Sequence, residues 1–149
     1  MIFVGADHGG WAMGRKLVVL LRKRGLDVES LLPERKNSRD DYPLLARELA
    51  RRVGTSPAHR GIALCRTGVG MAVVANKVQG IRAVAATEIW QVKGARHDED
   101  ANVLSLAADH VTLQQALRLV DAFLSTPFAK LPRYQRRLSE IRKLERRGR

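Results

Sequence analysis

The chain has 149 residues, enough for one domain, and 45% of them are hydrophobic. Its single cysteine excludes an internal disulfide and a cysteine-built zinc site. No apolar run approaches the roughly 20 residues that span a bilayer. The first residues lack the basic segment of a signal peptide, so we expect a cytoplasmic protein.

The formal net charge of +12 is unusual for a metabolic enzyme, and residues 130–149 hold nine Lys or Arg against two Glu. Nucleic acid is one partner that would explain such a charge. No nucleic-acid-binding motif or aromatic stacking surface accompanies it, however. We therefore interpret residues 130–149 as a solvated basic helix and tail, and expect neither nucleic acid nor a membrane as partner.

Strand-like and helix-like segments alternate along the chain. Gly25 is a natural residue to follow a helix, and Pro43 suits a first helical position. In chain order we expect a strand at 2–5, a helix at 11–24, a strand at 26–31, a helix at 43–53, a strand at 61–65, a helix ending near 77, a strand at 81–86, a helix at 88–96, a strand at 103–106 and helices at 113–125 and 134–147. We expect the last helix to pack through Leu138, Ile141 and Leu144. The sequence shows no internal repeat, so residues 1–149 are predicted to form one domain.

Strands separated by helices favour an α/β fold with a doubly wound, Rossmann-like parallel sheet of five strands, covered by helices on both faces. We predict the strand order 2-1-3-4-5. In that order the turns after the first and third strands lie side by side at the switch point, where ligands bind. Residues 7–10 and 65–70 would then share one crevice.

The segment at 61–76 carries the strongest signal for chemistry. A buried strand ends at Cys65, a turn with Gly68 and Gly70 follows, and a helix begins. Glycines allow close approach of a ligand, and the first amides of a helix attract anions. A cysteine there is a candidate base or nucleophile, although a lone cysteine is more often a small core residue.

Each neighbouring candidate also has a structural interpretation. Asp7 can cap a helix, His8 can be an ordinary loop histidine, and Thr67 can be a turn residue. A nucleotide-binding or RNA-binding module is the alternative from another functional class, since Gly68 and Gly70 form part of a dinucleotide fingerprint and Glu88 follows about 20 residues later. The third glycine of that fingerprint is missing.

A family resemblance covers nearly the whole chain. The matching segments, in order, are GADHGG at 5–10, DYP at 41–43, GIALCRTGVG at 61–70, ANK at 75–77, GIRA at 80–83, DANVL at 100–104 and RYQRR at 133–137. Together they resemble the type B ribose-5-phosphate isomerases and the related galactose-6-phosphate isomerase subunits. The resemblance implies aldose–ketose isomerisation of a sugar phosphate, ribose 5-phosphate above all, without a metal or organic cofactor.

The resemblance also implies roles for particular residues. Cys65 would be the base that moves a proton between C1 and C2 through a cis-enediolate. The turn containing Thr67, Gly68 and Gly70 would hold the developing oxyanion. The resemblance further implies a homodimer or homotetramer whose sites are shared between subunits. The remaining implied substrate contacts are Asp7, His8 and Tyr42, the phosphate-clamping Arg133 and Arg137, and Asn102, and the loop before Asn102 would complete a neighbour's site.

Several positions depart from the family pattern. They are Asp98 in place of the histidine that opens the sugar ring, Glu99 in place of Asn, Arg66 in place of Gly, Asp109 in place of Arg, and Tyr134 in place of His. Three hypotheses follow. Asp98 or His97 opens the ring of ribose 5-phosphate; the enzyme acts on a tetrose or hexose phosphate; or the chain binds a phosphorylated ligand without catalysis. Arg66 would return positive charge to the site, and Glu99 would contact substrate.

Overall fold

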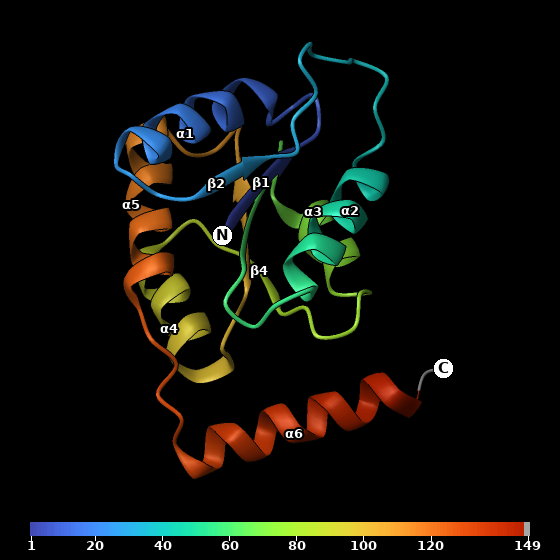
Figure 1. Ribbon diagram of the computed structural model, residues 1–149, viewed down its shortest axis with the longest axis vertical. Coiled ribbons are helices and arrows are strands. Elements are labelled where there is room, and N and C mark those ends of the chain that lie inside the picture. The colour runs from blue at the N-terminus through green and yellow to red at the C-terminus, as the bar shows by residue number, and fades with distance from the viewer. Residues whose placement is uncertain (148–149) are drawn as a thin grey trace.

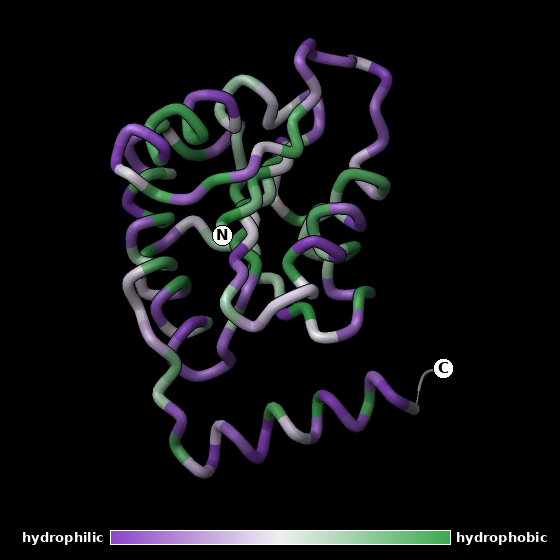
Figure 2. Tube along the Cα trace, viewed as in Figure 1, coloured by the Kyte–Doolittle hydropathy of each residue, from purple (hydrophilic) through white to green (hydrophobic). Residues whose placement is uncertain are grey.

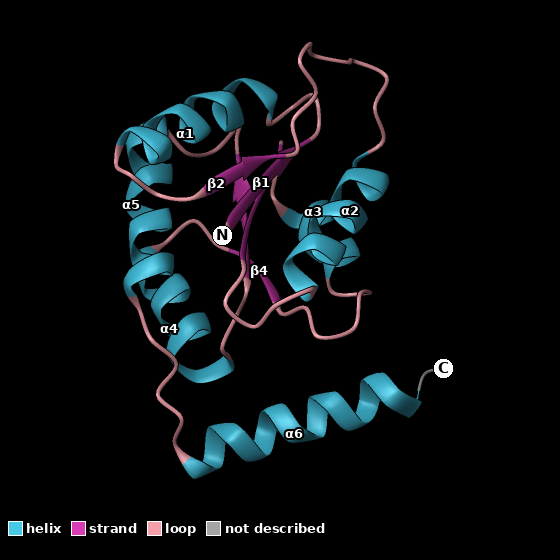
Figure 3. Cartoon of the chain, viewed as in Figure 1, coloured by secondary structure: helices cyan, strands magenta, loops and turns pink. Residues whose placement is uncertain are grey.

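A computed structural model describes residues 1–147; the final two residues of the basic tail lie outside the described range. Within that range strands and helices alternate (Figures 1 and 3). They are β1 (Ile2–Ala6), α1 (Trp11–Lys23), β2 (Val28–Ser30), α2 (Tyr42–Gly54), β3 (Arg60–Cys65), α3 (Val69–Ala75), β4 (Ala83–Ala85), α4 (Ile89–Glu99), β5 (Val103–Ala107), α5 (Leu113–Ser125) and α6 (Pro132–Arg147). The predicted alternation is confirmed, and Gly25 follows α1 with φ +78°.

All strand pairs in the sheet are parallel, as predicted, but the strand order is β2-β1-β3-β5-β4. The predicted order 2-1-3-4-5 is therefore wrong at one edge. β5 has five buried residues and pairs with the central β3, whereas β4 has three partly exposed residues and suits an edge. Asn76 pairs with the backbone of Ala83 in β4, donating at 2.9 Å and accepting at 2.7 Å.

Helices cover both faces of the sheet (Figure 1). Side chains of successive strand residues alternate between the faces, so Val4 packs in the core toward α1 and α5, while Phe3 packs with α2 and α3. Cys65 belongs to the second of these cores. Figure 2 shows hydrophobic residues gathered along the strands and hydrophilic ones on the connection between β2 and α2.

α6 lies beyond the end of the sheet that is opposite to the β2–α2 connection (Figure 1). Leu138 is buried, as predicted, but Leu144 is 66% exposed, so its predicted packing is not seen within one chain. The helix is held at the amino end of the sheet by the Glu145 carboxylate, which accepts a hydrogen bond from the Gly80 amide at 3.0 Å. None of the described helices is long and apolar enough to cross a membrane.

Candidate active site

The turns that follow β1 and β3 lie side by side, as the sequence predicts. The Asp7 amide, directly after β1, donates to the Leu64 carbonyl of β3 at 3.2 Å. A Cβ atom on Gly10 would lie 2.7 Å from the carbonyl carbon of Leu64, so only glycine allows this approach. The two turns therefore form one surface at the carboxyl end of the sheet.

The turn from β3 into α3 places a sulfur atom among backbone donors. The Cys65 Sγ accepts a hydrogen bond from the Gly68 amide at 3.1 Å, and Cys65 is 5% exposed. Gly68 has φ +74°, which a side chain would strain. Ser105 of β5 fixes this conformation, because its hydroxyl donates to the Gly68 carbonyl at 2.5 Å. The Thr67 hydroxyl accepts from the Val69 amide at 3.4 Å.

Asp7 and His8 hold the neighbouring turn. The Asp7 Oδ1 accepts from the amides of Gly9 and Gly10 at 2.9 and 3.0 Å, so this buried carboxylate shapes the turn. The His8 Nδ1 lies 2.7 Å from Asp40 Oδ1, which also accepts from the His8 amide at 3.1 Å. With Nδ1 engaged, the other ring nitrogen of His8 is the one left for a ligand.

Tyr42 and Arg66 border the same surface. A Cβ atom on Gly70 would lie 2.9 Å from Cε2 of Tyr42, so the ring rests against the backbone of Gly70. The Arg66 side chain passes over Gly9, and its Nε lies 3.7 Å from Asp109 Oδ2. Both members of that pair are well exposed, and such pairs contribute only about 0–1 kcal/mol. Arg66 is therefore free to exchange this carboxylate for another anion.

A second group of predicted residues lies at the other end of the sheet. α4 ends just before β5 begins, and the Ala129 amide ahead of α6 donates to the His97 carbonyl at 3.0 Å. The His97 Nδ1 is 2.6 Å from Asp98 Oδ1, and the His97 ring meets the Tyr134 ring edge-on at 5.8 Å. Arg133 donates to the Tyr134 hydroxyl at 3.1 Å, and the Arg137 guanidinium lies 5.9 Å from the same ring.

Hydrogen bonds shift the pKa values of two residues in this second group. The hydrogen bond from His97 lowers the pKa of Asp98, and smaller contributions come from Tyr134 and the charge of Arg133. The hydrogen bond with Tyr134 raises the pKa of Arg133, as does the Asp98 charge. Asp98 is thus stabilised as a carboxylate that fixes the orientation of His97.

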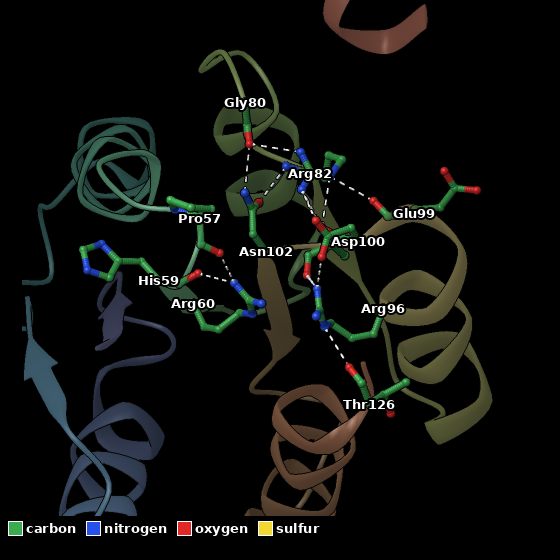
Figure 4. Close-up of polar contacts among 11 residues, drawn as sticks. Pro57, His59, Arg60, Gly80, Arg82, Arg96, Glu99, Asp100, Asn102 and Thr126 are labelled. Atoms are coloured by element: carbon green, nitrogen blue, oxygen red, sulfur yellow. Dashed lines mark hydrogen bonds and ion pairs between the residues drawn. The ribbon is translucent and has the colours of Figure 1, made fainter. Parts of the chain in front are cut away.

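Asn102 and Glu99 also lie at the amino end of the sheet, and Figure 4 shows their polar contacts. The Asn102 side chain accepts from the Arg82 amide and donates to the Gly80 carbonyl, both at 2.8 Å. It therefore ties the start of β5 to the segment before β4. Figure 4 shows the Glu99 carboxylate directed away from this network, in which only its carbonyl takes part, accepting from Arg82 at 2.9 Å.

Two supporting residues were not predicted from the sequence. Ser105 could have been found, because it is a polar residue in an otherwise apolar buried strand and must have a hydrogen-bond partner. Asp40 gave no comparable signal, since it lies in an irregular polar segment far from His8 in sequence. Among the described residues, no cluster of three or more His, Cys, Asp or Glu could hold a metal ion.

The two groups of residues cannot meet within one chain. β3 begins with Arg60 at the amino end and finishes with Cys65 at the carboxyl end, a span of about 17 Å at 3.3 Å per residue. A small substrate at Cys65 is therefore out of reach of the amino-end group of the same chain. The carboxyl-end group consists of Asp7, His8, Tyr42, Cys65, Arg66, Thr67, Gly68 and Gly70, and the amino-end group of His97, Asp98, Glu99, Asn102, Arg133 and Arg137.

Known proteins resemble this chain along almost its full length. Ribose-5-phosphate isomerase B of Escherichia coli is 35% identical over 146 residues, 98% of this chain and 97% of that protein. The enzyme of the same name from Mycobacterium tuberculosis is 32% identical, over 97% of this chain and 90% of its own.

Solved structures of such enzymes also resemble this chain. Ribose-5-phosphate isomerase B of Clostridium thermocellum superposes with a TM-score of 0.94 at 35% identity, covering 99% of both chains. The Mycoplasma genitalium enzyme, solved with bound ribulose-5-phosphate, has a TM-score of 0.92 at 34% identity, covering 97% of this chain and 95% of its own. The profile of the Ribose/Galactose Isomerase family matches residues 2–141, and the chain belongs to this family.

Proposed function

We propose that the protein is an aldose–ketose isomerase that interconverts ribose 5-phosphate and ribulose 5-phosphate. Family membership supports the reaction class, and the ribulose-5-phosphate bound to the Mycoplasma genitalium relative supports the substrate. The observation that carries the proposal is the position of the Cys65 sulfur. It accepts a hydrogen bond from the Gly68 amide at 3.1 Å, where the turns after β1 and β3 meet. A cytoplasmic location remains part of the proposal.

The proposed chemistry needs a base and a fixed set of donors. The Cys65 thiolate removes the C2 proton of the open-chain aldose, and the C–H electron pair becomes the double bond of a cis-enediolate. A proton passes between the oxygens on C1 and C2, and the Cys65 thiol then returns its proton to C1. The amides of the Thr67–Gly70 turn face the developing oxyanion, the charge whose stabilisation contributes most to such reactions. The low exposure of Cys65 keeps bulk water from the intermediate.

We infer that two copies of the chain complete each site. Cys65 and the amino-end group lie at opposite ends of β3, so the amino-end group can serve only the Cys65 of a second copy. Arg133 and Arg137 are four residues apart on α6, so they share a helix face and can grip a phosphate together. A twofold pair then contains two equivalent sites, each with Cys65 from one copy and the clamp from the other.

Within the amino-end group, we assign opening of the sugar ring to His97 and a positioning role to Asp98. Asp98 is stabilised as a carboxylate by the hydrogen bond from His97 at 2.6 Å, which makes it a poor proton donor. The same bond uses the Nδ1 proton of His97, so it is the imidazolium form that gives its Nε2 proton to the ring oxygen, while the C1 hydroxyl loses its proton to solvent. Asp7, His8, Tyr42 and Arg66 would bind the sugar and its phosphate from the other copy.

The experiment that tests the proposal follows ribose 5-phosphate in deuterated water by NMR, with wild type and Cys65→Ala. We expect wild type to form ribulose 5-phosphate and to exchange the C2 proton. The variant should keep its fold and its affinity for the sugar phosphate but lose both product and exchange, by about 10³-fold in rate. Full activity in Cys65→Ala would overturn the role of Cys65, and a wild type inert toward ribose 5-phosphate would overturn the substrate.

A second candidate substrate is a tetrose phosphate. The observation that favours it is Asp98, which stands where the family pattern has the histidine that opens the sugar ring. A tetrose 4-phosphate cannot close a furanose ring, so it would not need that histidine. The ratio of kcat/KM for ribose 5-phosphate and erythrose 4-phosphate separates the two. We expect ribose 5-phosphate to be preferred in wild type, and His97→Gln to lower turnover of ribose 5-phosphate alone.

A further inference from the structure

A cavity of about 680 Å³ opens at the amino end of the sheet, away from the Cys65 surface. The residues that matter to its chemistry are Arg60, Arg96, Asp100, Leu124, Phe128 and Lys130, and we call it the amino-end cavity. It lies between the start of β3, the end of α4 and the connection from α5 to α6. Figure 4 shows the polar contacts of Arg60, Arg96 and Asp100.

Among the described residues, Asp100 is the only carboxylate that lines the amino-end cavity, and it already has two cationic partners. It occupies a left-handed turn at φ 46° and accepts from Arg96 at 2.8 Å and from Arg82 at 3.0 Å. Arg96 is buried and also donates to the carbonyls of Ala101 and Thr126 at 2.6 and 3.2 Å. The Asp100 carboxylate is therefore already paired with two guanidinium groups, those of Arg96 and Arg82.

Arg60 and Lys130 bring further positive charge to the same cavity. Arg60 donates through Nη1 to the carbonyls of Pro57 and His59 at 2.9 and 2.7 Å, which are neutral acceptors. These two carbonyls do not balance its charge, and the guanidinium lines the cavity. Burial lowers the pKa of Arg60, and so do the charges of Arg96 and Arg82, while the charge of Asp100 acts in the opposite direction. Within residues 1–147, neither Arg60 nor Lys130 has a carboxylate within ion-pair distance.

A half-buried cation with no carboxylate at ion-pair distance is unfavourable, and an anion that binds directly to it relieves this. We propose that the amino-end cavity is a second anion site, which takes a small phosphate-bearing molecule between Arg60 and Lys130. Leu124 and Phe128 supply an apolar wall for the less polar part of that molecule. Arg60 and Lys130 are not members of the amino-end group proposed to serve the isomerase, and Arg60 lies at the opposite end of β3 from Cys65 of the same chain.

The test uses the full-length protein, inorganic pyrophosphate as the probe, and amide NMR shifts as the readout. We expect shifts at residue 60 and at residues 125–130. Arg60→Gln and Lys130→Gln should each raise the dissociation constant reported by those amides by about tenfold or more, the effect of losing a charge-assisted hydrogen bond. Arg47→Gln, an exposed position on α2 with the same change of charge, should alter it less than twofold.

Pyrophosphate can also occupy the isomerase site, where it would shift residues 68–70 instead. Arg137→Gln should remove those shifts and leave the ones at residues 125–130. The proposal is overturned if residues 60 and 125–130 do not respond to pyrophosphate, or if they respond equally in wild type, Arg60→Gln and Lys130→Gln. Neither result depends on what happens at residues 68–70, so failure here is distinct from failure of the isomerase.

Discussion

The two ends of the sheet position their functional groups in different ways. At the carboxyl end, backbone amides and buried residues set the geometry: Gly68 donates to Cys65, and Asp7 is 6% exposed. At the amino end, the proposed contacts are side chains on the exposed ends of helices, such as Asp98 and Arg133. The carboxyl end is therefore fixed by the fold of a single chain, whereas the amino-end group is proposed to act at the site of a second copy.

This contrast has a thermodynamic consequence. A change in the carboxyl-end turn should disturb both the fold and the chemistry, because the same backbone serves both. A change in the exposed amino-end group should alter substrate binding and leave the free energy of unfolding nearly unchanged. The predictions that follow test this division, beginning with the largest expected effect.

Gly68→Ala should be the most damaging of these substitutions. A side chain at φ +74° costs about 1–2 kcal/mol, and the new Cβ would lie 3.1 Å from the backbone of Leu106. Displacing the Gly68 amide removes its hydrogen bond to the Cys65 sulfur and shifts the turn proposed to hold the oxyanion, so kcat should fall by about 10²–10³-fold, the effect of losing one preorganised donor. Thermal unfolding and steady-state rates measure the two effects.

The matched control is Gly94→Ala, because Gly94 lies in α4 with no atom within 4 Å of an added Cβ. It should stabilise the protein by about 0.5–1 kcal/mol and keep the rate. Equal losses in both variants would show that the Gly68 turn has no special role.

Arg137→Gln should act on binding with little effect on the fold. Its guanidinium is exposed, so we expect the free energy of unfolding to stay within about 0.5 kcal/mol of wild type. Loss of one charged contact to the phosphate should raise KM by about 10–100-fold. Arg142→Gln removes an equal charge from an exposed position on the opposite side of α6 from Arg133, and serves as control. A matching rise in KM for Arg142→Gln would rule out a specific clamp.

The smallest expected effect is a shift in the titration of Asp98. Its pKa is lowered from the ordinary value of 3.8 chiefly by the hydrogen bond from His97, so the carboxylate stays charged until the pH falls through that lowered value. Carbon-13 NMR should place the midpoint below 3.8 in wild type and higher in His97→Ala. His59→Ala, which removes a histidine elsewhere in the chain, should leave the midpoint unchanged. An unshifted midpoint in His97→Ala would contradict the assigned pair.

The carboxyl end could be predicted from sequence because its signals are local. An apolar strand followed by Gly68 and Gly70 predicts a turn, and parallel topology places that turn beside Asp7. The strand order was wrong because the six-residue segment at 81–86, apolar except for Arg82, contains a strand of only three residues, which is too short for the interior of the sheet.

The amino end could be predicted only in part. The pattern of α6 shows which side is apolar, but it does not say whether the same chain or another one covers it. Leu138 is buried in its own chain and Leu144 is not, although both belong to one stripe. Local sequence signals could not predict the pairing of His8 with Asp40 either, because an irregular segment separates the two residues. Long-range contacts of this kind depend on the whole fold.

The central claim is that each site takes Cys65 from one copy and the Arg137 clamp from another. The direct test combines Cys65→Ala and Arg137→Gln, each nearly inactive at low substrate concentration, by joint refolding in equal amounts. Random pairing puts half of the molecules in mixed pairs, and each mixed pair regains one intact site, so activity should return to about a quarter of wild type. No recovery in proven mixed pairs would contradict the account, because a site built within one chain would leave every site defective.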